Sequence, residues 1–123
     1  MTNDATNGPR SLAEPLSWQP GDDERERRAH DLLGRARLVR AQGWDAFRHT
    51  WSSGEVAGVA LVLDDADVLC GAAENEAAAF GSWAANLWGI AGGEADSGNG
   101  YKLTIEWFSA LRAVLEHDER REQ

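Results

Sequence analysis

Five carboxylates lie within residues 64–76, and no lysine or arginine interrupts them: Asp64, Asp65, Asp67, Glu74 and Glu76. Side chains of this type can do two kinds of chemistry. Two of them, together with water molecules, can hold a magnesium ion. An unbalanced group of them attracts the basic side chains of a partner protein. A plainer interpretation is a solvated loop that ends one helix and caps the next, and the charge pattern favours it.

The metal interpretation predicts a hydrolase of a phosphate substrate that uses Mg²⁺ or Mn²⁺ held by Asp64, Asp67, Glu74 and Glu76. If this segment is helical, Asp64 and Asp67 are three residues apart and share a face. However, the Glu74-x-Glu76 spacing is not an E-x-x-E pair, and no basic residue nearby could hold the phosphate. We therefore expect no metal and no cofactor, and we keep the hydrolase as an alternative.

The docking interpretation draws on a wider charge pattern. Residues 49–101 hold eight carboxylates and three tryptophans but no lysine or arginine, within a chain of net charge −9. Such a surface attracts basic proteins and repels nucleic acid and anionic membranes. Tryptophan is enriched among the residues that dominate binding energy at interfaces. We therefore predict a partner-binding surface for a basic protein, made of Asp64, Asp65, Asp67, Glu74, Glu76 and Trp83.

Trp83 has a second interpretation as a core residue. It lies three residues from Phe80 and four from Leu87, at the edge of an apolar stripe. That position favours burial over exposure. It is therefore the least secure member of the predicted surface.

The remaining reactive side chains form no recognisable catalytic or metal-binding pattern. His30, His49 and His117 are far apart in the sequence and lack metal-binding spacing. Cys70 is the only cysteine, and its apolar neighbours predict a small buried thiol. The loop expected at 92–100 lacks the ligand spacing of a calcium loop. We therefore predict no catalytic residue and expect the protein not to be an enzyme.

The elements that carry these residues are predicted to be helices. Residues 23–42 have acids in the first turn, arginines near the end and a stripe at Ala29, Leu32, Leu33, Ala36 and Val39. Residues 44–51, with tryptophan and phenylalanine at spacings of three and four, predict a short helix. Residues 74–88 predict another helix, followed by the loop at 92–100.

Two segments are ambiguous between helix and strand. Residues 56–63 form an apolar run, but Ser52 and Glu55 before it have the spacing of a capping box. Residues 101–107 alternate like a strand, yet a helical stripe runs through Trp107, Phe108 and Leu111. We predict a compact all-α bundle of four to five helices. The fallback is an α+β fold with a short two-stranded sheet from 56–63 and 101–107.

Small residues recur at every fourth position along the helix expected at 74–88. They are Ala77, Gly81, Ala85 and Gly89. Small side chains at this interval let another backbone approach closely. The stripe therefore predicts a tight helix–helix crossing, either within one chain or across a homodimer. A self-assembling structural subunit is a further functional alternative.

Length and composition bound the organisation of the chain. Its 123 residues suit one domain, expected at 23–117, with a disordered arm at 1–22 and a frayed tail at 118–123. One cysteine and a polar beginning predict a cytoplasmic protein. We therefore expect a non-enzymatic acidic binding protein, such as an inhibitor, an antitoxin-like protein or an adaptor.

Overall fold

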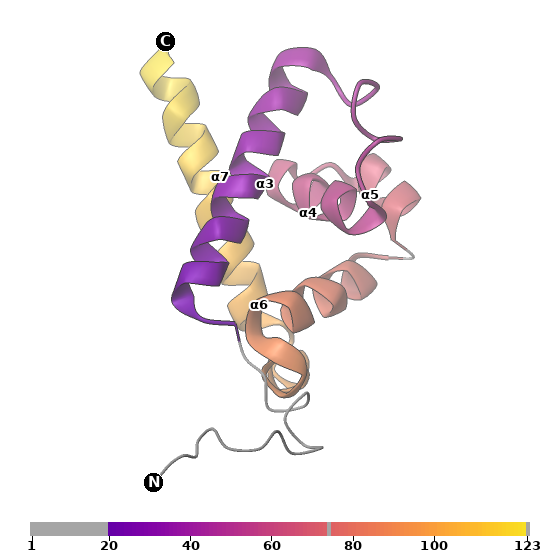
Figure 1. Cartoon of the computed structure of the whole chain (residues 1–123), viewed down its shortest axis with the longest axis vertical. Coiled ribbons are helices and arrows are strands. Elements are labelled where there is room, and N and C mark those ends of the chain that lie inside the picture. The colour runs from indigo at the N-terminus through magenta and orange to yellow at the C-terminus, as the bar shows by residue number, and fades with distance from the viewer. Residues whose placement is uncertain (1–19, 74, 123) are drawn as a thin grey trace, which may run out of the picture.

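Helix α4 (Ser53–Leu63) is the centre of the protein. All its residues from Val56 to Val62 are buried, as expected for a helix that is apolar on every side. In this computed structural model, which describes residues 20–73 and 75–122, four further helices contact it (Figure 1). They are α3 (Asp22–Gln42), α5 (Ala66–Ala72), α6 (Glu76–Gly98) and α7 (Lys102–Glu122).

The predicted all-α class is confirmed. Within the described ranges every regular element is a helix, and there are five of them. The ambiguous segments are therefore helical over 56–63 and 102–107, Tyr101 is a turn residue with a φ of 61°, and the fallback sheet does not form there. Of the predicted arm at 1–22, residues 1–19 lie outside the described part of the chain.

The capping box before α4 is confirmed and explains why the apolar run is a helix. The hydroxyl of Ser52 accepts a hydrogen bond from the Glu55 amide at 3.2 Å, and the Glu55 carboxylate accepts one from the Ser52 amide at 2.9 Å. The helix ends at Asp64, whose φ of 58° is left-handed. Asp65 then caps α5 by accepting a hydrogen bond from the Val68 amide.

Helix α3 follows its predicted pattern closely. Acids occupy its first turn, and Gly43 ends it with a φ of 87°. The buried side chains are those of the predicted stripe, Leu32, Leu33, Ala36 and Val39. It crosses α7, and the two helices diverge toward their C-terminal ends (Figure 1). In the C-terminal half of α3, Arg37 forms an ion pair with Asp118 at 2.6 Å.

The predicted helix at 44–51 is wrong. This segment consists of turns, in which the amides of Phe47 and Trp51 donate to the carbonyls of Trp44 and Phe47. A helix this short is weakly favoured by itself, so side-chain contacts decide its shape. Here the Trp44 indole donates to Asp65 at 2.9 Å, and the Phe47 and Trp51 rings stack at 4.8 Å.

The helix predicted at 74–88 is interrupted directly after Trp88, as expected. The predicted loop at 92–100 is wrong for residues 92–98, which are helical. Gly89 has a φ of 86° and kinks α6, and helical structure resumes beyond it. The second half of α6 folds closely onto the first. A Cβ at Gly93 would lie 2.9 Å from the Ala85 nitrogen, so only glycine fits there.

The beginning of α7 is held by a side chain from α6. The buried carboxylate of Asp96 accepts hydrogen bonds from the amides of Leu103 and Thr104 and from the Thr104 hydroxyl. These bonds satisfy donors that the first turn of a helix leaves unpaired. Beyond this turn α7 buries Phe108, Leu111 and Leu115, and its backbone remains helical through most of the tail expected to fray.

Candidate functional site

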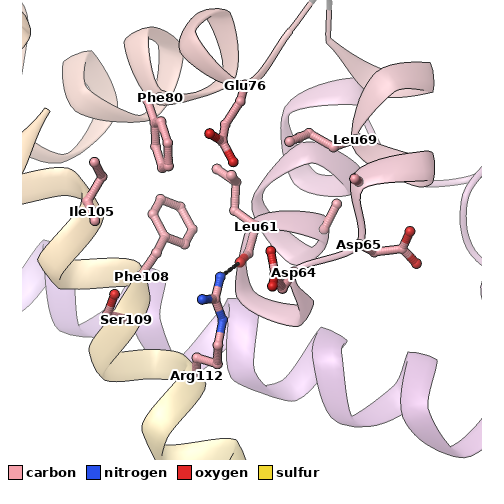
Figure 2. Close-up of a pocket in the computed structure, with 12 residues that line it drawn as sticks. Leu61, Asp64, Asp65, Leu69, Glu76, Phe80, Ile105, Phe108, Ser109 and Arg112 are labelled. Atoms are coloured by element: carbon pink, nitrogen blue, oxygen red, sulfur yellow. Dashed lines mark hydrogen bonds between the residues drawn. The ribbon is translucent and has the colours of Figure 1, made fainter. Parts of the chain in front are cut away.

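A pocket of about 220 Å³ lies where the α4–α5 junction, the start of α6 and the middle of α7 meet (Figure 2). We call it the acidic pocket. Its lining combines an apolar floor with charged groups, contributed by Ala60, Leu61, Asp64, Asp65, Ala66, Leu69, Glu76, Phe80, Ile105, Phe108, Ser109 and Arg112.

Three of the five clustered carboxylates line this pocket. Asp64 follows the last residue of α4, Asp65 precedes the first residue of α5, and Glu76 is the first residue of α6. Because each lies at a helix end, three elements bring them together. Asp67 is exposed in the first turn of α5 and is not among the lining residues, whereas Glu74 lies outside the described residues.

The three carboxylates differ in how many hydrogen bonds they already make. Asp65 is engaged, since it accepts from the Val68 amide and from the Trp44 indole, and Figure 2 shows its carboxylate pointing away from Arg112. Asp64 and Glu76 are exposed, and neither side-chain carboxylate has a polar partner in the described part of the chain. They are therefore available to an external cation.

Arg112 brings a positive charge to the same pocket, and sequence reasoning missed it. Its guanidinium donates to the carbonyl of Leu61 at 2.6 Å and to that of Val62 at 3.2 Å. It thus places a charged donor on two carbonyls of the last turn of α4, where intrahelical amide donors run out. The only available signal was its position beside the stripe of Phe108, Leu111 and Leu115 on α7.

The floor of the acidic pocket is aromatic and aliphatic. The rings of Phe80 and Phe108 are 6.4 Å apart, and Leu61 and Leu69 lie on the α4–α5 side (Figure 2). Long basic side chains place an aliphatic stem on apolar surface and keep their charge in a polar setting. The pocket offers both environments within one concavity.

Trp83 does not contribute to this surface. Only 9% of it is exposed, its indole donates to the Gly54 carbonyl at 3.1 Å, and its ring meets Phe108 edge-on at 5.7 Å. It also fills the space above Gly58, where a Cβ would lie 2.5 Å from its ring. Trp83 is therefore a core residue, and its predicted place in the partner-binding surface is wrong.

Within this chain the stripe of small residues makes no single helix crossing. Ala77 and Ala85 are exposed, Gly81 faces the Tyr101 hydroxyl, and Gly89 is the buried kink of α6. The first three lie on one unbroken helical segment, so a crossing in a homodimer stays a prediction. The close backbone contact of α6 is made by Gly93 instead.

The arginines of α3 neutralise few of the acids at 49–101. Arg35 pairs with Glu55 at 2.9 Å and with Asp31 at 2.8 Å, whereas Arg25 pairs with Asp22 and Arg28 with Glu24. Arg25 and Arg28 also bind α6, through the Leu87 carbonyl and the Asn86 side chain. The basic face of α3 is therefore largely structural.

The other reactive residues gain no catalytic arrangement. Among the described residues, no group of three or more histidine, cysteine or acidic side chains is placed to hold a metal ion. Cys70 is exposed and free of any disulfide, so the expected buried thiol is wrong: it lies on the outer side of the short helix α5, whose inner side carries Val68 and Leu69.

Comparison of the chain with protein-family models, with curated proteins and with solved structures found no match. None of the helices in the described part of the chain is long and apolar enough to cross a membrane.

Proposed function

We propose that this chain is a non-enzymatic binding protein that engages a basic partner protein through the acidic pocket. The observation that carries the proposal is that Asp64 and Glu76 line the same pocket above its apolar floor. Both carboxylates are exposed, and neither has an ion pair or a hydrogen bond with another described residue. A lysine or arginine side chain of a partner could satisfy both features at once.

Charge balance supports this assignment. Arg112 is the one basic residue among the described residues that line the pocket, and its hydrogen bonds go to the carbonyls of Leu61 and Val62. Two carboxylates thus face one guanidinium that is already bonded elsewhere, which leaves the pocket negative. Attraction of this kind speeds the encounter of oppositely charged proteins and weakens as salt rises.

The two alternative functions have less support. For a hydrolase built on Asp64, Asp67, Glu74 and Glu76, no group of three or more metal-ligating side chains is found among the described residues. A self-assembling subunit joined through the small-residue stripe keeps only Ala77, Gly81 and Ala85 on one helix face, because Gly89 is the kink of α6. A cytoplasmic location belongs to the proposal because the chain has a single cysteine and so forms no internal disulfide.

The proposal is tested by affinity capture from a lysate of the source organism, quantified by mass spectrometry. The wild-type chain is compared with Asp64→Asn/Glu76→Gln and with Glu26→Gln/Glu94→Gln. The control removes two exposed charges that do not line the pocket, so both variants have the same net charge. We expect a basic protein that is captured by the wild type and the control but lost from the pocket variant and at high salt.

Capture that is equal for all three proteins would contradict the proposal. So would loss from the control and the pocket variant alike, because net charge and not the pocket would then explain the binding.

A further inference from the structure

A second pocket, of about 330 Å³, is lined by basic and not by acidic side chains. It lies between the turns at 44–51, the start of α4 and the end of α5. We call it the basic pocket, and its lining is Arg48, His49, Trp51, Ser53, Val56, Val68, Gly71 and Ala72. Although the chain carries 21 acids against 12 lysines and arginines, none of these lining residues is acidic.

The polar side chains of the basic pocket suit an anion. Arg48 presents a guanidinium, His49 an imidazole and Ser53 a hydroxyl. Arg48 and His49 are exposed, and neither has an ion pair or side-chain hydrogen bond within the described part of the chain. Their donors therefore remain available, unlike those of Arg35 or Arg112. Guanidinium groups bind carboxylates and phosphates through short, charge-assisted hydrogen bonds.

The segment that carries these two side chains is firmly positioned. Trp51 stacks on Phe47 at 4.8 Å, and the Arg35 guanidinium lies 4.8 Å from the Trp51 ring. Trp44 is tied to Asp65. The Arg48 guanidinium lies over Gly71. A Cβ at Gly71 would be 3.5 Å from the guanidinium, which is an ordinary contact distance, so the guanidinium is not crowded there. Fixed flanks lower the entropic cost of ordering a bound group.

We propose that the basic pocket binds a small oxyanion, a phosphate or carboxylate group, through Arg48 and His49. The apolar side chains of Val56, Val68 and Ala72 would contact the body of the molecule that carries the group. This site is separate from the acidic pocket, and its occupancy does not depend on the proposed protein partner.

The test is an NMR titration of the full chain at constant ionic strength, with inorganic phosphate in one arm and acetate in the other. We expect saturable shifts at the Arg48 side chain and at amides of residues 48–53 and 68–72 with at least one anion. The arm with the tighter response distinguishes phosphate from carboxylate. In Arg48→Gln the affinity should fall about tenfold or more, because a charge-assisted bond is lost.

His49→Gln provides an independent variant and should weaken the same response. Arg27→Gln removes an exposed arginine of α3 and should leave it unchanged. Spectra of the free variants establish that the fold is retained, as expected for exposed side chains. The absence of saturable shifts with either anion, or an undiminished response in Arg48→Gln, would overturn the proposal.

Discussion

Asp96 and the pair Asp64 and Glu76 belong to the same acidic stretch of sequence, yet they stand in opposite surroundings. Asp96 is 2% exposed and accepts three hydrogen bonds from the first turn of α7. Asp64 and Glu76 are exposed and have no described polar partner. A carboxylate whose oxygens already accept hydrogen bonds serves the fold, whereas one without such donors is available for binding.

The largest effect on stability is expected at Asp96. Asp96→Asn removes the negative charge of the buried cap of α7. It also replaces one acceptor oxygen with an NH2 group, which would then face a backbone N–H donor of Leu103 or Thr104. We expect the free energy of unfolding to fall by about 2–4 kcal/mol, measured by urea denaturation. A loss below about 0.5 kcal/mol would contradict the structural role of Asp96, because its contribution would then be no larger than that of a surface acid.

A second large effect is expected at Gly58, which is buried in α4 against the Trp83 ring. Gly58→Ala places a Cβ within 2.5 Å of the Trp83 ring, so the ring or α4 must move. Overpacking of this kind costs about 1–3 kcal/mol. Gly34→Ala is the matched control, since a Cβ there meets nothing within 4 Å and replaces a mid-helix glycine. Thermal denaturation should show a lower Tm for Gly58→Ala and an unchanged or higher Tm for Gly34→Ala.

An intermediate effect is expected at Asp65, which lines the acidic pocket but is bonded like Asp96. Asp65→Ala removes the cap of α5 and the partner of the Trp44 indole. We expect a loss of about 1–2 kcal/mol in the free energy of unfolding. Asp65→Asn, which keeps a capping oxygen, should lose less. Equal losses in the two variants would show that the charge, and not the hydrogen bonds, is what matters there.

The smallest effect on stability is expected for Asp64→Asn/Glu76→Gln. Neither side chain has a described bond to lose, and asparagine tolerates the left-handed backbone of Asp64. The free energy of unfolding should change by less than about 0.5 kcal/mol. A larger loss in urea denaturation would show that these acids serve the fold and would remove the contrast with Asp96.

Much of the fold followed from local patterns in the sequence. The stripe of α3, the capping box at Ser52 and Glu55 and the stripe of α7 each have one physical cause within a few residues. The helical segment after Gly89 did not follow, because Gly92 and Gly93 resemble chain breakers until their packing is known. Close approach of the two halves of α6 is a tertiary contact, which a local pattern does not encode.

The candidate site was predicted only in part for the same reason. Asp64, Asp65 and Glu76 are close in sequence, so their grouping was visible. Arg112 lies 36 or more residues away from them, and its place in the acidic pocket depends on how α7 crosses α4. The bonded state of Asp65 depends on Trp44 from the preceding segment. Such long-range partners decide which acids are free.

The most direct test of the acidic pocket is an NMR titration of the full chain with a short arginine-containing peptide at about 50 mM and about 300 mM salt. We expect saturable shifts at residues 64–65, 76 and 105–112 that weaken at high salt. They should be lost in Asp64→Asn/Glu76→Gln and retained in Glu26→Gln/Glu94→Gln. Shifts spread over all acidic faces, or shifts that persist in the pocket variant, would contradict the account.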